Sequence, residues 1–249
     1  MHSYWYRLLA LIALMILFLQ GSQAIRNGKE INISLEAPWT VGIWVYRENT
    51  TDVCTGSILA RNFVVTAAQC VWTVAFDHIN IQYGSSNLWS DPGKGIVYVK
   101  NVSFLRYRPD TLSNNIALLE TQKPMMLDNV TAQAINLPDL EYDPMIDSMV
   151  YVSGFGGDKS FSEGHQLMAA NFTVKDREKC EVSLQEFCAM GEGGAFLEKG
   201  DEGDPAVQNN RLVGVATYQP TRSTDLPAIF TKVGSFVIWI VSIIGPNRA

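Results

Sequence analysis

The sequence has few histidines and few cysteines, and both shortages limit the chemistry that it can support. Of its 249 residues, three are histidine and four are cysteine. Beyond residue 24 the histidines are His78 and His165, and neither has ligand spacing to a pair of cysteines. Zinc sites are built from such closely spaced ligands. We therefore expect no metal site and no cofactor.

Long charge runs, internal repeats and low-complexity tracts are also absent. The formal net charge is -6 at pH 7, and acidic residues are spread along the chain. Nucleic-acid binding depends on clustered Lys and Arg, so this balance argues against a nucleic-acid partner. With 47% hydrophobic residues, the chain has enough apolar side chains to bury a sizeable core.

One long apolar run lies at the start of the sequence. The twelve residues Leu8 to Leu19 follow Arg7 and precede Gly21-Ser22-Gln23-Ala24. Spanning a bilayer takes roughly 20 apolar residues, so an uncleaved membrane anchor is the weaker interpretation. Small residues three apart are typical of a signal-peptidase site. We predict a signal peptide over residues 1–24, then a secreted, extracellular chain over 25–249 with no membrane attachment.

In a secreted chain, cysteines can form disulfides and Asn-x-Ser/Thr triplets can carry glycans. Four cysteines permit three pairings, and the pairing that closes the shortest loops joins Cys54 to Cys70 and Cys180 to Cys188. Asn-x-Ser/Thr triplets occur five times, and in a secreted chain they predict glycans on the surface. Their asparagines are Asn32, Asn49, Asn101, Asn129 and Asn171.

Short apolar runs rich in β-branched and aromatic residues predict an all-β fold. The acidic segment Glu141 to Asp147 separates two sets of such runs, which suggests two packed β-barrels, over about 25–137 and about 148–249. Residues 234–244 are mostly strand formers but precede a Gly-Pro stop signal, so periodicity leaves them open between strand and helix. The predicted strands are 40–46, 63–67, 79–83, 96–102, 116–119, 149–152, 169–174, 212–218 and 229–233.

VVTAAQC and eight further short segments, in order, resemble landmarks of the chymotrypsin-like (trypsin family, peptidase S1) serine peptidases. The resemblance covers essentially all of residues 25–249. It implies two packed six-stranded antiparallel β-barrels and a C-terminal α-helix over the ambiguous tail. The segments are IRNG at 25–28 with PWTV at 38–41, CTGSIL at 54–59 leading to VVTAAQC at 64–70, NIALL at 115–119, VSGFG at 152–156, FCA at 187–189, GDEGDP at 200–205 and IFTKV at 229–233.

The resemblance places this family's catalytic triad at three positions, and all three are substituted. Gln69 stands at the imidazole position, Asn115 at the carboxylate position and Glu202 at the serine position. A serine nucleophile needs an imidazole to take its proton and a carboxylate to orient and stabilise that imidazole. An amide cannot accept a proton near pH 7, and a carboxylate at the serine position would repel an oxyanion. We expect no catalytic residues.

No other residue offers an obvious replacement for the triad. His165 and His78 are interpreted as surface histidines outside any matching segment. Glu202 and Asp204 could form an acid and base pair as in glycoside hydrolases. Two residues apart on a turn, with no sugar-binding aromatic cluster identifiable around them, they are better interpreted as a solvated acidic edge. Together with Glu198, that edge is one candidate for a binding surface.

The same alignment predicts an altered substrate pocket and a retained N-terminal ion pair. Phe196 falls at the pocket floor, with Gln219 and Ala228 on its walls, so we expect a filled S1-like cleft. Gly200 is retained at the position that resembles the family's oxyanion-hole glycine. In this family an aspartate before the serine pairs with a new N-terminal amine, and here those positions are Asp201 and Ile25. We hypothesise that signal cleavage alone releases the Ile25 amine; the alternative is a disordered N-terminus.

The resemblance therefore implies a secreted, catalytically inactive homologue that binds an extracellular protein. Roles as cofactor, decoy or regulator are expected, with an active serine protease or another secreted protein as partner, in seminal or digestive fluid. One alternative is an active S1-family endopeptidase with a misplaced nucleophile, but the turn at 200–205 contains no serine. A structural matrix component is the other, and it would need repeats that the sequence lacks.

Overall fold

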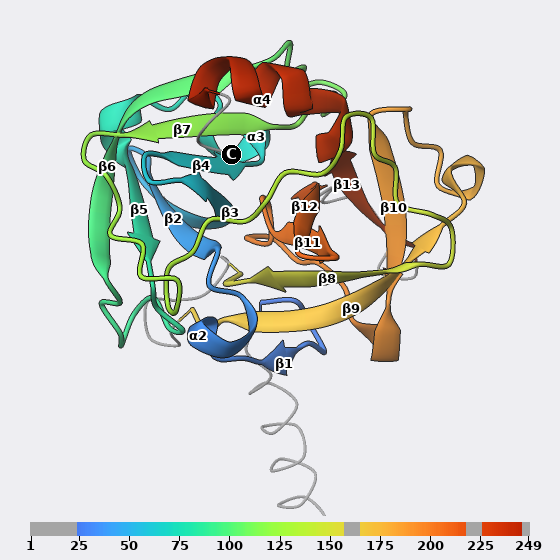
Figure 1. The fold of residues 1–249 in the computed structure, drawn as a ribbon, viewed down its shortest axis with the longest axis horizontal. Helices are drawn as coiled ribbons and strands as arrows, with labels where there is room; N and C mark the ends of the chain where they lie inside the picture. The colour runs from blue at the N-terminus through green and yellow to red at the C-terminus, as the bar shows by residue number, and fades with distance from the viewer. Residues whose placement is uncertain (1–23, 157–164, 218–225, 246–249) are drawn as a thin grey trace, which may run out of the picture.

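The computed structural model describes residues 24–156, 165–217 and 226–245, and within them two closed antiparallel β-barrels lie side by side (Figure 1). This confirms the predicted fold. The first barrel has the order β2-β3-β4-β7-β6-β5, and in the second the β8–β9 pairing closes β9-β10-β13-β12-β11-β8. The first-barrel strands are β2 (Thr40–Tyr46), β3 (Thr51–Ala60), β4 (Phe63–Thr66), β5 (Ile79–Tyr83), β6 (Gly95–Phe104) and β7 (Ala117–Thr121). The second-barrel strands are β8 (Met149–Gly154), β9 (Met168–Lys175), β10 (Glu186–Gly191), β11 (Pro205–Gln208), β12 (Arg211–Thr217) and β13 (Ala228–Lys232).

Alternation along the strands directs the apolar side chains into the barrels. In β2, Val41, Ile43 and Val45 are fully buried in the first core, because every second residue of a strand faces the same side. Between them Trp44 faces outward from that core, where its indole N–H donates to the Oε1 of Gln82 at 3.0 Å. Both faces of β2 are therefore covered, which explains its nearly continuous apolar sequence.

Both predicted disulfides are confirmed, and they use all four cysteines. Cys54 of β3 is bonded to Cys70, and Cys180 is bonded to Cys188 of β10. The predicted strand before Cys70 extended to Ala67, and this was too long. β4 ends at Thr66, and the short helix α3 (Ala68–Val71) then turns Cys70 back towards β3.

The two ends of the described chain each pack against the barrel farther away in sequence. β1 (Lys29–Glu30) pairs with β9, so residues 25–30 belong with the second barrel and not with the first, where the predicted boundary put them. After β13 come a 3₁₀ turn, η4 (Val233–Phe236), and the predicted helix, α4 (Val237–Ile244). Its Ile240 and Ile244 are buried in the cluster that contains the first-barrel core. Gly245, at φ +85°, ends the helix.

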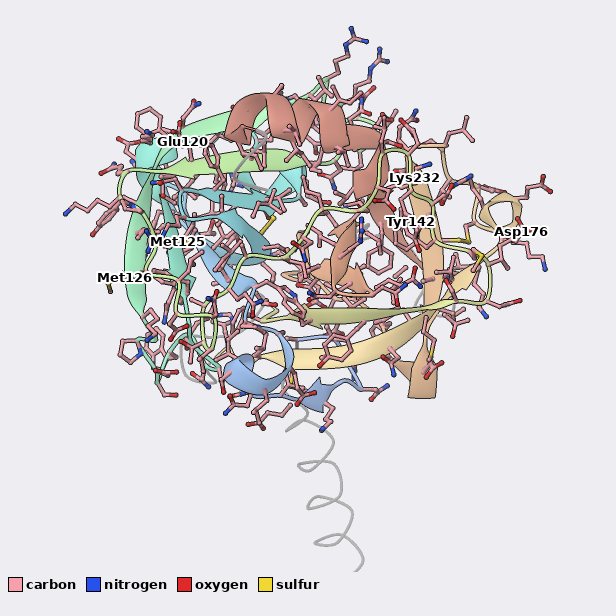
Figure 2. The ribbon with its side chains drawn as sticks, viewed as in Figure 1. Glu120, Met125, Met126, Tyr142, Asp176 and Lys232 are labelled. Carbon is pink, nitrogen blue, oxygen red and sulfur yellow. A yellow bond between two sulfur atoms is a disulfide. The ribbon has the colours of Figure 1, made fainter. Side chains whose placement is uncertain are left out.

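The connection between the barrels, residues 122–148, is fixed at several points along its length. Met125 is fully buried, whereas the adjacent Met126 is 64% exposed. Further along, the Tyr142 hydroxyl lies over the second barrel and donates to Oε1 of Gln208 at 2.6 Å (Figure 2). The connection therefore behaves as part of both cores. No helix in the described ranges is long and apolar enough to span a bilayer.

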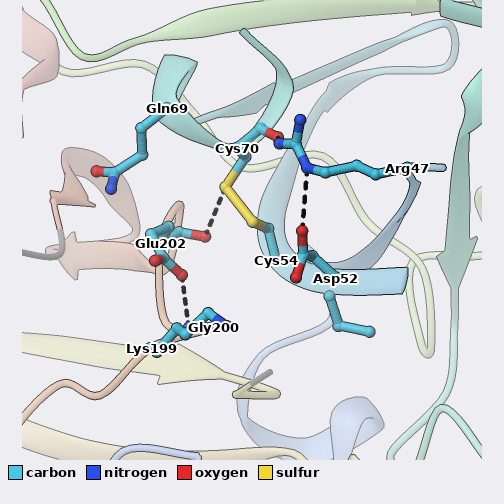
Figure 3. A pocket seen from close by; sticks show the side chains of 9 residues that line it. Arg47, Asp52, Cys54, Gln69, Cys70, Lys199, Gly200 and Glu202 are labelled. Atoms are coloured by element: carbon cyan, nitrogen blue, oxygen red, sulfur yellow. Dashed lines mark hydrogen bonds and ion pairs between the residues drawn. A yellow bond between two sulfur atoms is a disulfide. The ribbon is translucent and has the colours of Figure 1, made fainter. Parts of the chain in front are cut away.

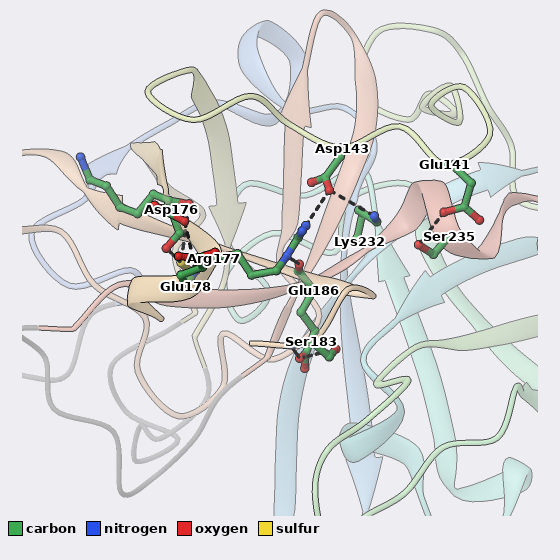
Figure 4. Close-up of polar contacts among 11 residues, drawn as sticks. Glu141, Asp143, Asp176, Arg177, Glu178, Ser183, Glu186, Lys232 and Ser235 are labelled. Carbon is green, nitrogen blue, oxygen red and sulfur yellow. Dashed lines mark hydrogen bonds and ion pairs between the residues drawn. The ribbon is translucent and has the colours of Figure 1, made fainter. Parts of the chain in front are cut away.

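A polar cluster holds the end of this connection to the second barrel (Figure 4). Asp143 accepts from Arg177 at 2.5 Å and from the buried Lys232 at 3.2 Å through the same oxygen. Nearby, the Ser235 hydroxyl donates to the Glu141 carboxylate at 3.2 Å. Lys232 is 6% exposed, and a lysine at that depth needs a carboxylate partner. The cluster therefore has a structural role, which is to hold the connection to the second barrel.

Candidate functional site

The three substituted positions meet at the junction of the two barrels. Gln69 lies on α3, Asn115 lies two residues before the start of β7, and Glu202 lies on the turn before β11. Gln69 and Glu202 line one small cavity of about 90 Å³ (Figure 3). Asn115 lies behind Gln69 and is hydrogen-bonded to it. The fold has therefore kept the arrangement in which one barrel supplies two of the positions and the other supplies the third.

Asn115 is fully buried, and its side chain is satisfied at both ends. Its Oδ1 accepts from the backbone N–H of Gln69 at 2.8 Å. Its Nδ2 donates to Gln69 Oε1 at 2.5 Å and to the hydroxyl of Thr217 at 3.2 Å. A neutral amide pair thus occupies the place of an imidazole and a carboxylate, and neither member can take up a proton near pH 7. The sequence placed Thr217 on the predicted wall strand before Gln219 but did not predict this contact, which β12 makes from the second barrel.

Glu202 is partly exposed, and its carboxylate folds back onto its own turn (Figure 3). Oε2 accepts from the backbone N–H of Gly200 at 2.5 Å. Burial raises the pKa of the carboxyl to about 7, while hydrogen bonds from the backbone N–H groups of Glu202 and Gly200 and the charge of Lys199 oppose that rise. Gly200 has φ +97°, a conformation that glycine adopts without strain.

Asp204 corrects the prediction of a solvated acidic edge. Its side chain is fully buried and lies so close to Gly154 that a Cβ there would meet Oδ1 at 2.0 Å. Neither carboxylate oxygen has a hydrogen bond of acceptable geometry, although the Thr55 hydroxyl is near enough to lower the pKa. Burial, followed by the charge of Asp201, raises the pKa of Asp204 well above its usual range. A partner cannot reach this carboxyl from the surface.

Glu198 is not part of an open acidic edge either. Its side chain is 21% exposed and forms an ion pair with Arg26 at 3.1 Å. The three carboxylates at positions 198, 202 and 204 therefore differ in environment: one is paired, one is bound to its own turn and one is enclosed. The predicted binding surface made of these residues does not exist in the described structure.

Asp201 is fully buried beside the nitrogen of Ile25. The two oxygens lie 3.1 and 3.3 Å from Ile25 N, and the backbone N–H of Glu198 donates to Oδ2 at 2.8 Å. Burial raises the pKa of Asp201 well above its usual range, and these N–H groups act in the opposite direction. Ala24, which precedes Ile25, is only 2% exposed. The geometry fits the predicted ion pair, and the free amine at Ile25 stays a prediction.

Of the three predicted pocket residues, the structure describes Phe196 and Ala228. Phe196 is half-buried, its backbone bridges Arg26, and the Arg26 guanidinium lies 5.7 Å from the centre of its ring. Ala228 begins β13 opposite Ala189 of β10. Gln219 lies outside the described residues. A filled S1-like cleft therefore stays a prediction.

The remaining candidate residues are dispersed. His78 is exposed as predicted, but His165 is buried, with Nδ1 3.0 Å from the Gly156 carbonyl oxygen and its ring edge-on to Trp44. That corrects the prediction of a surface histidine, and neither ring lies at the site. In the described ranges no group of three His, Cys, Asp or Glu side chains could hold a metal ion. All five glycosylation asparagines are exposed: Asn32, Asn49, Asn101, Asn129 and Asn171.

Two six-stranded barrels, a site at their junction and a short C-terminal helix define a chymotrypsin-like protein. The chain belongs to the trypsin family, since the family model described as Trypsin matches residues 25–240. It is 31% identical over 224 residues to Trypsin Tyr p 3.0101 of Tyrophagus putrescentiae, which covers 82% of this chain and 75% of that relative. Trypsin Blo t 3 of Blomia tropicalis is 28% identical over 219 residues, covering 82% and 80%.

Two similar solved structures are proteins described as inactivated. The scabies mite inactivated protease paralogue S-I1 superposes with a TM-score of 0.82 at 43% identity, covering 87% of this chain and 98% of that chain. Paralogue S-D1 gives a TM-score of 0.81 at 42% identity, covering 89% and 98%.

Proposed function

We propose that this chain is a secreted, non-catalytic homologue of trypsin-family peptidases that acts by binding another extracellular protein, as a cofactor, decoy or regulator. The observation that carries the proposal is the neutral pair formed by Gln69 and Asn115 beside Glu202. The inactivated neighbours support it. Five exposed glycosylation asparagines and two disulfides support secretion.

The site offers no route to peptide hydrolysis. Gln69 cannot remove a proton, and Glu202 has no hydroxyl to make nucleophilic. Removing the whole triad of a serine peptidase costs on the order of 10⁶ in kcat. What then remains comes from the oxyanion hole and substrate binding, and here the Gly200 N–H already binds Glu202. Binding is the activity that these residues leave available.

A serine-reactive fluorophosphonate probe tests the proposal directly. The secreted protein, purified after signal removal, should remain unlabelled at a concentration where an active trypsin is labelled completely. Strong labelling that disappears on heat denaturation would overturn the non-catalytic assignment and favour an active peptidase. Affinity purification of the tagged protein from its native fluid then asks for the partner. Recovery of one stoichiometric protein supports the proposal, and recovery of none opposes it.

A further inference from the structure

The backbone N–H of Gly200, on the turn before β11, donates to the carboxylate of Glu202 at 2.5 Å. The backbone N–H of Glu202 itself acts on the same carboxyl and lowers its pKa. In serine peptidases the corresponding pair of N–H groups binds the negatively charged oxygen of the tetrahedral intermediate. This chain has therefore kept the donors of an oxyanion hole while losing the groups that would generate an oxyanion.

The Gly200 donor is already occupied by the side chain of Glu202. A carboxylate carries the same charge as an oxyanion, and hydrogen bonds to an ionised acceptor are roughly twice as strong as neutral ones. The cavity left beside it is about 90 Å³, whereas pockets that bind ligands are roughly 300–1,000 Å³. A substrate carbonyl would have to displace the carboxylate before its oxygen reached either N–H group.

We propose that the oxyanion hole of this chain is a carboxylate-binding site whose permanent ligand is the side chain of Glu202. The inference deepens the proposed non-catalytic function and rests on it. Glu202 acts here as an internal ligand that excludes the carbonyl oxygen of any peptide laid across the site. A protein partner must accordingly bind without inserting a peptide carbonyl into the hole.

The occupied hole also explains how the turn keeps its shape with no external ligand. Apart from the side-chain contact, the Glu202 carbonyl accepts from Thr55 N–H at 3.0 Å, and Gly203 N–H donates to the Ala216 carbonyl at 3.0 Å. These bonds fix the end of the turn that is attached to the barrels. The bond from Gly200 to the carboxylate fixes the other end. Removing the carboxylate should leave the Gly200 N–H without this acceptor and available to another anion.

The test is an acetate titration of ¹⁵N-labelled secreted protein, followed at the amide resonance of Gly200. Glu202→Ala opens the hole and should give a saturable acetate-dependent shift of that resonance. In wild type the carboxylate of Glu202 competes with acetate for the same N–H, so wild type should bind acetate at least about tenfold more weakly. Glu198→Ala is the matched control, because that nearby carboxylate pairs with Arg26 and not with the hole. It should respond to acetate as wild type does.

Glu202→Gln keeps the test decisive even if the alanine variant folds poorly. The amide keeps the shape and an acceptor oxygen but cannot ionise, so the Gly200 resonance should titrate near neutral pH in wild type and not in the variant. Asp201, Asp52 and Lys199 also act on Glu202 and are present in both proteins.

A folded Glu202→Ala protein whose Gly200 amide ignores acetate would overturn the inference. An unchanged pH response of Gly200 in Glu202→Gln would overturn it as well. Labelling of wild type by the fluorophosphonate probe would instead overturn the proposed function, and the acetate titration would still be interpretable on its own. The two failures are therefore distinguishable.

Discussion

Replacing Asp204 with asparagine should flatten the dependence of stability on pH. Asp204 is a fully buried carboxyl without a well-formed hydrogen bond, and burial raises its pKa well above the usual range. The folded protein therefore keeps a proton there at pH values where the unfolded chain, with an ordinary pKa of about 3.9, has released it. Stability is greatest in acid and falls as the pH rises from about 4 to the pKa of the folded state.

The size of the effect follows from the linkage between protons and folding. When the folded state holds one proton more than the unfolded chain, each unit by which the pH rises lowers the free energy of unfolding by up to about 1.4 kcal/mol. Glu202 also has a raised pKa and contributes with the same sign, so wild type should lose stability between acidic and neutral pH. Asp204→Asn should reduce the slope of the free energy of unfolding against pH by the contribution of about one proton.

Urea denaturation at several pH values between 5 and 8 measures the slope. Glu178→Gln is the control, since it neutralises an exposed carboxylate of the same barrel. We compare slopes rather than absolute stabilities, because the asparagine amide at position 204 also needs hydrogen-bond partners. If Asp204→Asn and wild type show equal slopes, the buried carboxyl is not protonated in the folded state and the reasoning fails.

Four further predictions concern the site and its supports. Gln69→His alone should give no cleavage of fluorogenic peptides, because Asn115 and Glu202 remain. Asn115→Ala should lower the free energy of unfolding by about 2–4 kcal/mol, since it leaves buried partners unsatisfied. Replacing Cys54 and Cys70 by alanine should cost about 3 kcal/mol for a sequence separation of 16, and the second disulfide, with a separation of 8, about 2.5 kcal/mol. N-terminal sequencing of the secreted protein should begin at Ile25.

Each of these predictions has a result that contradicts it. Peptide cleavage by the single histidine variant would mean that another residue supplies the nucleophile. Additive losses in a double-mutant cycle of Asn115→Ala with Gln69→Ala would show that the two amides are not coupled. A larger loss from the shorter disulfide would argue against loop closure as the source of stability. Any start other than Ile25 would exclude its insertion as an amine beside Asp201.

The strands that the sequence predicted well are those with a continuous apolar run. β2 and β5 match the predicted residues at both ends. β3, β10 and β11 were not predicted as strands; β3 carries Thr55, Gly56 and Ser57 at its centre, and β11 begins with Pro205. Backbone pairing with the neighbouring strands decides their conformation: β3 is paired with β2 and β4, and β11 is paired with β12 and with β8, which is distant in sequence.

The site shows the same division between local and distant information. The three substitutions at Gln69, Asn115 and Glu202 were predicted from the family resemblance, and both disulfides were predicted from the pairing that closes the shortest loops. The burial of Asp204 was not, because it depends on Gly154 leaving room across the barrel. Binding of Glu202 to Gly200 depends on the shape of the turn, which no residue type specifies. The predictions were wrong where a side chain's surroundings come from another strand.

The crossed packing of the two chain ends has a consequence for cleavage of the backbone. Ile25 lies in the core of the second barrel, while α4 closes the cluster that contains the first. Each barrel thus depends on a segment attached to the opposite side of the connection at 122–148. A protease that cut this connection would produce two fragments that stay associated, because each fragment holds part of the other's core. Such a nicked protein should separate only under denaturing conditions, and would keep its binding surfaces in place after the cut.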